Sequence, residues 1–134
     1  MTEVISKEKA TEEISSWMDS KKIIPGKRES FKDHIETLVQ AVMYGMLSVN
    51  DDNTLSQKLL YPVGENNAIS ELVFKSRLNR QMITPHMAGV KSGDNDARII
   101  GYMAALTGKN KAILSVLDSE DQRIADSIVV FFVG

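Results

Sequence analysis

The stretch Thr54–Lys75, TLSQKLLYPVGENNAISELVFK, decides the fold, because apolar residues recur at even spacing on both sides of a turn signal. The turn is Gly64–Asn67, whose residue types favour a tight change of direction. The apolar residues that share a face are Leu55, Leu59, Tyr61 and Val63 before the turn, and Ala68, Leu72 and Phe74 after it. A period of two is typical of strands, so the stretch is predicted to form a β-hairpin.

A further short strand is expected before this hairpin. The turn signal Asn50–Asn53 separates it from Met46–Val49, so the sheet is expected to have two or three antiparallel strands. Pro62 cannot donate to a strand ladder, which limits it to an edge position or a strand end. So small a sheet is not stable alone in water and has to pack against helices.

Two helices are predicted before the sheet. The first covers Lys7–Ser20, with an apolar stripe at the helical period. Pro25 and Gly26 break the chain, and a second helix is expected over Arg28–Tyr44. Ser30 followed three residues later by Asp33 resembles a capping arrangement for this second helix.

More helices are predicted after the sheet. A short segment covers Asn79–Met82, and a longer helix is capped by Asp94 and stopped by Gly108. A brief helix over Lys109–Leu117 follows, and Ser119 begins a capping box for the last helix. The predicted class is α+β, mostly helical with a small sheet in the middle of the chain. Residues 1–50 would form a helical region, and residues 51–134 a hairpin followed by helices, in one compact unit.

The composition limits the classes of function. The chain has 134 residues, 43% hydrophobic and 25% charged, which suits one soluble domain without metal or disulfide crosslinks. A net charge of −2 argues against nucleic acid as the main partner, because phosphate binding usually needs a basic excess. No signal peptide or membrane span is expected, and the lack of cysteine suits a reducing cytoplasm.

No catalytic, cofactor or metal site is predicted. The two histidines, His34 and His86, lack metal-binding spacing and are interpreted as ordinary surface residues. No serine lies in a nucleophile motif. Asp118, Glu120 and Asp121 cluster at a predicted helix N-terminus, where acidic groups interact favourably with the exposed amides.

The end of the sequence is unusually apolar. Ile128–Gly134, IVVFFVG, has no charged residue, so one side of this helix is expected to be exposed as an interaction surface. The alternative is a final helix that lies deep in a groove of the fold. Six of the seven methionines lie within or beside apolar stripes, and such side chains either fill the core or form adaptable binding surfaces.

From Gln57 onward the chain resembles the tail assembly chaperones of Mu-like and related contractile-tailed phages. The matching segments, in order, are Lys58–Gly64, Ile69–Lys75, Ala104–Gly108, Leu117–Asp121 and Ile128–Phe132. Each segment alone is common among proteins, and their order, spacing and endpoint together carry the likeness. Residues before about position 50 lie outside it.

The resemblance implies a non-enzymatic viral protein of the host cytoplasm, absent from the mature virion. It would bind the phage tape measure protein, a long helical ruler, and keep it soluble during tail tube assembly. The tail tube protein is a second candidate partner, and a homo-oligomer is expected if the apolar terminus is exposed. A helix-in-groove contact needs an adaptable apolar surface. The predicted contact residues are Leu114, Leu117, Ile124, Ile128, Phe131 and Phe132.

Two other functions stay open. The two helices joined across Pro25 and Gly26 loosely resemble a helix-turn-helix, which would suit a small DNA-binding regulator. The connection is too long for that motif, and the net charge is negative. The other alternative is a structural tail component retained in the virion.

Overall fold

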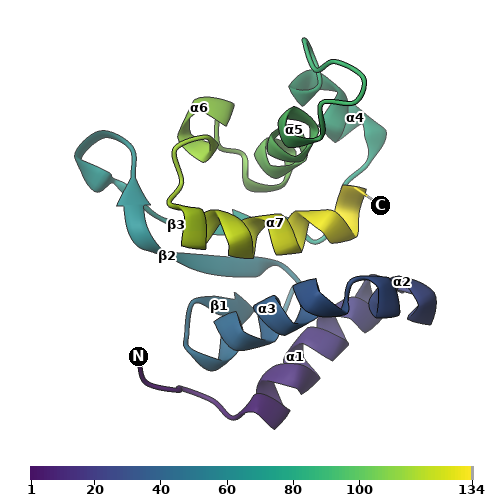
Figure 1. The fold of residues 1–134 in the computed structure, drawn as a ribbon, viewed down its shortest axis with the longest axis vertical. Coiled ribbons are helices and arrows are strands. Elements are labelled where there is room, and N and C mark those ends of the chain that lie inside the picture. Colours follow the sequence, from purple (N-terminus) through teal and green to yellow (C-terminus); the bar gives the residue numbers. More distant parts are fainter. Residues whose placement is uncertain (134) are drawn as a thin grey trace.

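The predicted α+β class is confirmed by a computed structural model, which describes residues 1–133 (Figure 1). The first helix, α1 (Lys7–Ser20), has the predicted bounds. Ser6 caps it by accepting the backbone N–H of Lys9 at 3.2 Å. Its apolar stripe is buried, and the helix packs against α3; the buried residues are Ala10, Ile14, Trp17 and Met18.

The predicted helix Arg28–Tyr44 is wrong in one respect, because the chain forms two helices here. These are α2 (Pro25–Ser30) and α3 (Lys32–Met43), separated at Phe31, whose φ of −107° and ψ of 23° are not helical. Pro25 begins α2, a position where its missing N–H costs no hydrogen bond. The Ser30 hydroxyl donates to the Gly26 carbonyl at 3.0 Å, so the predicted capping role of Ser30 is also wrong.

The sheet has three antiparallel strands in the order β1 (Leu47–Val49), β2 (Leu55–Val63) and β3 (Ile69–Phe74). The short helix η1 (Glu65–Asn67) makes the turn between β2 and β3. One face of the sheet is buried and the other is more exposed, as the alternation predicted for Leu55, Leu59, Leu72 and Phe74. The prediction was wrong for Tyr61 and Ala68, which are exposed. Buried side chains come from Leu55, Gln57, Leu72 and Phe74, whereas Lys58, Glu71 and Val73 are exposed.

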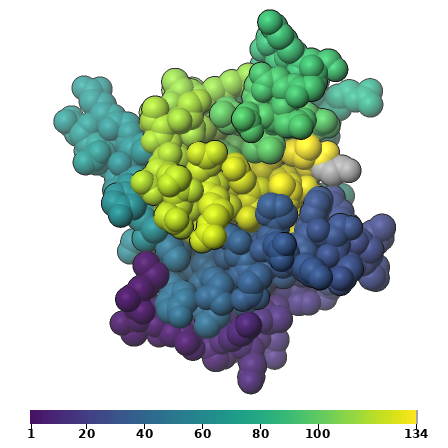
Figure 2. Space-filling model, in the orientation of Figure 1, coloured from purple at the N-terminus to yellow at the C-terminus, as the bar shows by residue number. Residues whose placement is uncertain are grey.

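A bulge in β2 bends the hairpin. Lys58 pairs with Glu71 and Val63 pairs with Ile69, so β2 advances five residues while β3 advances two. Pro62 lies in this irregular stretch, where no ladder pairing is interrupted by its missing N–H. The bent tip of the hairpin projects from the body of the protein (Figures 1 and 2).

The chain after the sheet is helical. Its elements are α4 (Arg80–Ile83), η2 (Thr84–His86), α5 (Asn95–Thr107), α6 (Lys111–Leu114) and α7 (Ser119–Val133). Asp94 caps α5 by accepting the Ala97 N–H at 3.1 Å, and Gly108 ends it with a φ of 71°, both as predicted. The predicted cap of α7 is displaced by one residue. Ser119 is already helical, and Asp118 accepts the Glu120 N–H at 3.0 Å.

Helix α7 occupies the centre of the fold. It contacts α5 on one side, α3 on another and β2 behind (Figure 1). Its buried residues therefore surround much of the helix axis and include Ile124, Ala125, Ile128, Val129 and Phe131. A helix that is covered on several sides is apolar all round, which explains the uncharged sequence of its second half.

Candidate functional site

The side chains predicted to contact a partner lie inside the protein. Their exposed fractions are 3% for Leu114, 7% for Leu117, 5% for Ile124, 0% for Ile128 and 3% for Phe131, and Phe132 is half-buried. The expectation of an exposed apolar terminus is therefore wrong for the described residues of α7. The alternative, a final helix deep in a groove, is what the structure has.

Phe131 joins the last turn of α7 to the N-terminal helices. Its ring centroid lies 5.6 Å from that of Trp17 and 5.4 Å from that of Phe31, with interplanar angles of 87° and 88°. Edge-to-face contacts of this kind are favourable for aromatic rings. The Phe131 carbonyl also accepts a hydrogen bond from Lys27 Nζ at 3.2 Å, which places a cation at the C-terminal end of the helix.

Lys21 covers the neighbouring ring of Phe132. Its ammonium nitrogen lies 3.5 Å from the ring centroid, within the range of a cation–π contact. The pKa of Lys21 is lowered to about 8, mainly by burial and in addition by the positive charges of Arg77 and Lys27. The Lys21 ammonium therefore covers one face of the half-buried Phe132 ring.

His34 and Ser127 form a hydrogen bond between α3 and α7. The distance from His34 Nδ1 to Ser127 Oγ is 3.0 Å. A serine beside a histidine is a possible nucleophile and base, but Ser127 is only 2% exposed and neither residue lines the hollows described below. We interpret the pair as an interhelical contact. The prediction that His34 is an ordinary surface residue is wrong, because it is half-buried and bonded.

Asp121 lies in the first turn of α7, as predicted, but it is 0% exposed and contacts more than the amides of its own helix. Its carboxylate accepts the backbone N–H groups of Leu60 at 2.9 Å and Tyr61 at 3.0 Å, in the bulge of β2. Its carbonyl accepts the side-chain amide of the buried Gln57 at 2.9 Å. The burial of Asp121 could have been predicted from its position in the sequence, because it lies one turn before Ile124 and Ala125 on the inward stripe of α7.

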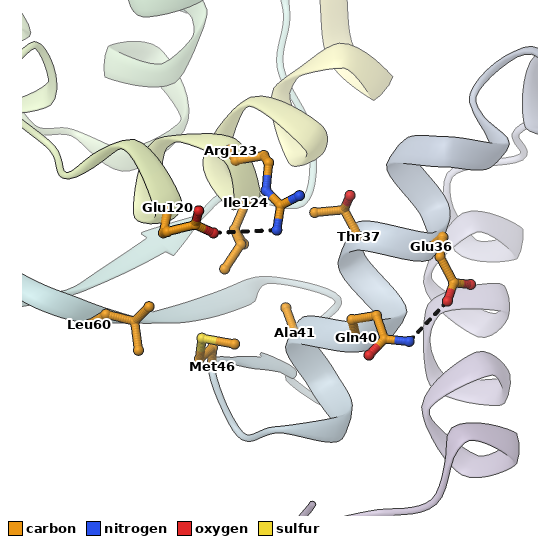
Figure 3. Close-up of a pocket in the computed structure, with 9 residues that line it drawn as sticks. All are labelled: Glu36, Thr37, Gln40, Ala41, Met46, Leu60, Glu120, Arg123 and Ile124. Atoms are coloured by element: carbon orange, nitrogen blue, oxygen red, sulfur yellow. Dashed lines mark hydrogen bonds and ion pairs between the residues drawn. The ribbon is translucent and has the colours of Figure 1, made fainter. Parts of the chain in front are cut away.

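A groove lies between α3 and α7, and we call it the α3–α7 groove (Figure 3). It is lined by Glu36, Thr37, Gln40, Ala41, Met46, Leu60, Glu120, Arg123 and Ile124 and has a volume of about 210 Å³. The floor is apolar and the rims are polar. Glu36 and Gln40 form the rim on α3, and Glu120 and Arg123, paired at 3.3 Å, form the rim on α7. Of the predicted contact residues, Ile124 reaches this groove.

The groove borders the bent hairpin at Leu60, which lines it and is 38% exposed. The next residue, Tyr61, is 59% exposed and is not among the lining residues. Exposed aromatic and aliphatic side chains beside a concave surface are typical of contact sites. The α3–α7 groove and these two side chains together are the candidate binding surface.

A second hollow lies on the other side of α7, between α7, α5 and α6, and we call it the α5–α7 pocket. Its volume is also about 210 Å³, and it is lined by Asp96, Ile99, Ile100, Met103, Leu114, Ser115, Gln122 and Asp126. Of the predicted contact residues, Leu114 reaches this pocket. The surface of α7 separates the pocket from the groove, so the two hollows lie on opposite flanks of that helix.

The methionines are divided between the core and partly exposed positions. Met18, Met43 and Met103 are buried, whereas Met46, Met82 and Met87 are half-buried. Of these three, Met46 lines the α3–α7 groove. Within residues 1–133 no cluster of three or more histidine or acidic side chains could hold a metal ion.

Comparisons with known proteins found no match: no protein-family model, no curated protein and no solved structure is similar to this chain. None of the helices described for residues 1–133 is both long and apolar enough to cross a membrane.

Proposed function

We propose that this chain is a non-enzymatic phage tail assembly chaperone that binds the tape measure protein and keeps it soluble during tail tube assembly. It would act in the host cytoplasm and be absent from the mature virion. The tape measure protein is a long helix, and its apolar face needs cover until tube subunits surround it. The tail tube protein is a secondary candidate partner.

Support for the proposal comes from the way the segments that resemble the family contact one another. The segment Leu117–Asp121 holds the segment Lys58–Gly64 through the two hydrogen bonds from Leu60 and Tyr61 to Asp121. The segment Ile69–Lys75 holds Ala104–Gly108, because the Lys75 N–H donates to the Leu106 carbonyl at 3.0 Å and Lys75 Nζ donates to the Ala105 carbonyl at 3.0 Å. Segments that are separate in the sequence are thus neighbours in the fold. If these segments are the signature of a family fold, we expect them to contact one another in this way.

The contact surface in this proposal is the α3–α7 groove, not the apolar terminus. The buried side chains of α7 cannot reach a partner without unfolding the core, whereas Met46 and Leu60 line the groove and are partly exposed. A groove between a helix pair with an apolar floor and polar rims suits an amphipathic helix. The observation that carries the proposal is this groove, next to a hairpin that bears the resemblance.

The test is co-expression with the tape measure protein encoded in the same phage genome. We expect the chain to raise the soluble fraction of the tape measure protein and to copurify with it. Overlapping fragments of the tape measure protein then locate the bound segment by calorimetric titration. If the tape measure protein is equally soluble without the chain, and no fragment binds, the proposal is wrong.

A pair of matched variants tests the surface. Leu60→Asp places a charge in the α3–α7 groove, and we expect it to weaken binding by at least about tenfold, as for loss of a central apolar contact. Val73→Asp is the control, because Val73 is 45% exposed on β3 and does not line the groove. Both variants are checked by circular dichroism and thermal unfolding. Equal binding by both folded variants would exclude the groove.

A DNA-binding measurement distinguishes the chaperone from the DNA-binding regulator. A chaperone of this kind should not bind random-sequence duplex DNA at low salt. Appreciable affinity with a steep dependence on salt would instead favour the DNA-binding regulator. Mass spectrometry of purified phage particles distinguishes the chaperone from a structural tail component, because a structural component would remain in the virion.

A further inference from the structure

The α5–α7 pocket is amphiphilic. On α5, Asp96, Ile99, Ile100 and Met103 follow one another at helical spacing and form one wall. Across it, Gln122 and Asp126 lie one turn apart on α7. The apolar side chains line the deeper part, since Met103 is 1% exposed and Leu114 is 3% exposed. The two carboxylates therefore belong to the two helices that face each other across an apolar floor.

None of the ion pairs found among residues 1–133 includes either carboxylate of the pocket, Asp96 or Asp126. Burial raises the pKa of Asp126, the nearby charge of Asp96 raises it further, and the Gln122 hydrogen bond and the charge of His34 oppose the change. A half-buried carboxylate is costly to desolvate unless a positive group compensates it. The pocket is therefore complementary to a cation.

We propose that the α5–α7 pocket binds an alkylammonium group, with the methylene chain on Ile99, Ile100 and Met103 and the ammonium between Asp96 and Asp126. A free aliphatic amine and a lysine side chain of a protein partner share this chemistry. The inference is independent of the tape measure proposal, because it concerns a different flank of α7 and needs no particular partner.

The lining distinguishes this ligand from other cations. A calcium or magnesium ion takes six or more oxygen ligands, whereas the pocket is lined by two carboxylates and mostly apolar carbon. The ammonium of an alkylamine needs few acceptors, and its methylene stem is stabilised by apolar walls. The pocket volume of about 210 Å³ exceeds the ~150 Å³ of an engineered apolar cavity that binds benzene, so a short alkyl chain can enter.

The test is an NMR titration of the isotope-labelled chain at pH 7 with n-butylammonium chloride. We expect saturable shifts confined to the signals of Ile99, Ile100, Met103 and Leu114. Sodium butyrate has the same chain with the opposite charge, and n-butanol is neutral. We expect no shifts with butyrate and only weak ones with butanol. Shifts of equal size and midpoint with butanol would overturn the proposal, and so would the absence of saturable shifts with butylammonium.

Variants test the role of the carboxylates. We expect Asp126→Asn to weaken butylammonium binding by about tenfold, the loss typical of one charge-assisted hydrogen bond. Asp33→Asn is the matched control, because it removes the same charge from an exposed position on α3 outside the pocket. If the two variants bind equally and both are folded, the proposal is overturned.

The two sources of the ligand are separated by competition. Nα-acetyl-lysine N-methylamide presents a lysine side chain without charged termini. If it displaces butylammonium, the pocket accepts a lysine and the protein-partner source is supported. If only free amines bind, the pocket is a small-molecule site. Both results retain the alkylammonium site, and neither depends on whether the tape measure protein binds.

Discussion

The carboxylate of Asp121 accepts the backbone N–H of Leu60 at 2.9 Å, which joins the start of α7 to a bulge sixty-one residues earlier in the chain. The second carboxylate oxygen accepts the next N–H, that of Tyr61, at 3.0 Å. Two successive amides of the bulge, for which the ladder provides no pairing, are therefore satisfied by one side chain. The hydrogen bonds hold β2 in the bent course that lines the α3–α7 groove.

The first prediction concerns this carboxylate. In Asp121→Asn, one acceptor oxygen is replaced by an NH₂ group that would face a backbone N–H. We expect the free energy of unfolding to fall by about 2–3 kcal/mol, because a charged hydrogen bond is lost and a buried donor is left unpaired. Urea denaturation followed by circular dichroism measures the change.

Glu120→Gln is the control for Asp121→Asn. Glu120 lies in the same first turn of α7, so its replacement removes a similar interaction with the helix N-terminus, but its side chain is exposed. We expect a loss below about 1 kcal/mol. If the two variants are destabilised equally, the hydrogen bonds from the bulge to Asp121 do not stabilise the contact between α7 and β2.

The second prediction concerns Phe131. Its ring is 3% exposed between Trp17 and Phe31, so Phe131→Ala should destabilise the fold by about 4 kcal/mol, as for other large aromatic truncations in cores. Phe132→Ala should cost clearly less, because that ring is half-buried under Lys21. Thermal unfolding of both variants is the measurement. Similar midpoints for parent and Phe131→Ala would show that the ring is not core.

The third prediction is a pH dependence at Asp126. Its pKa is raised in the folded state, so the folded chain binds this proton more tightly than the unfolded chain does. Stability from this group therefore decreases as pH rises from the ordinary aspartate value through the raised value. We expect Asp126→Asn to increase the free energy of unfolding at pH 7, with the gain vanishing below a pH of about 3.9. A variant less stable than the parent at pH 7 would contradict this assignment.

The fourth prediction is a pH dependence of opposite sign at Lys21. Its folded pKa of about 8 lies below its ordinary value of 10.5, so the unfolded chain holds this proton more tightly. Stability should therefore rise between pH 8 and pH 10.5. The rise should be smaller in Lys21→Met than in the parent, and unchanged in Lys9→Met, whose side chain is exposed on α1. Identical pH profiles for all three chains would count against the shift.

Local chemistry made much of the fold predictable. The two strands of the hairpin, the cap at Asp94 and the stop at Gly108 agree with the prediction, because each depends on neighbouring residues. The predicted alternation fails at Tyr61, where the bulge shifts the register. The break at Phe31 was missed, since nothing in the local periodicity separates α2 from α3. The cap of α7 was predicted at Ser119 but lies one residue earlier, at Asp118, and both residue types are suitable caps.

The candidate site was less predictable, because it depends on contacts between distant parts of the chain. The uncharged second half of α7 would suit an exposed surface and a covered centre equally well. Only the positions of α3, α5 and β2 around α7 decide between them. The burial of Asp121 likewise depends on a bulge sixty residues away. Both hollows are formed between elements remote in sequence, so no single segment indicates either one.

The central position of α7 has a consequence for biosynthesis. Every element that α7 covers precedes it in the chain, so α3, α5 and the inner face of the sheet leave the ribosome with their apolar sides bare. Until Ser119–Val133 emerge, the nascent polypeptide has no native partner for those sides and is exposed to aggregation. A stop codon before Ser119 should therefore yield an insoluble fragment rather than a smaller folded protein.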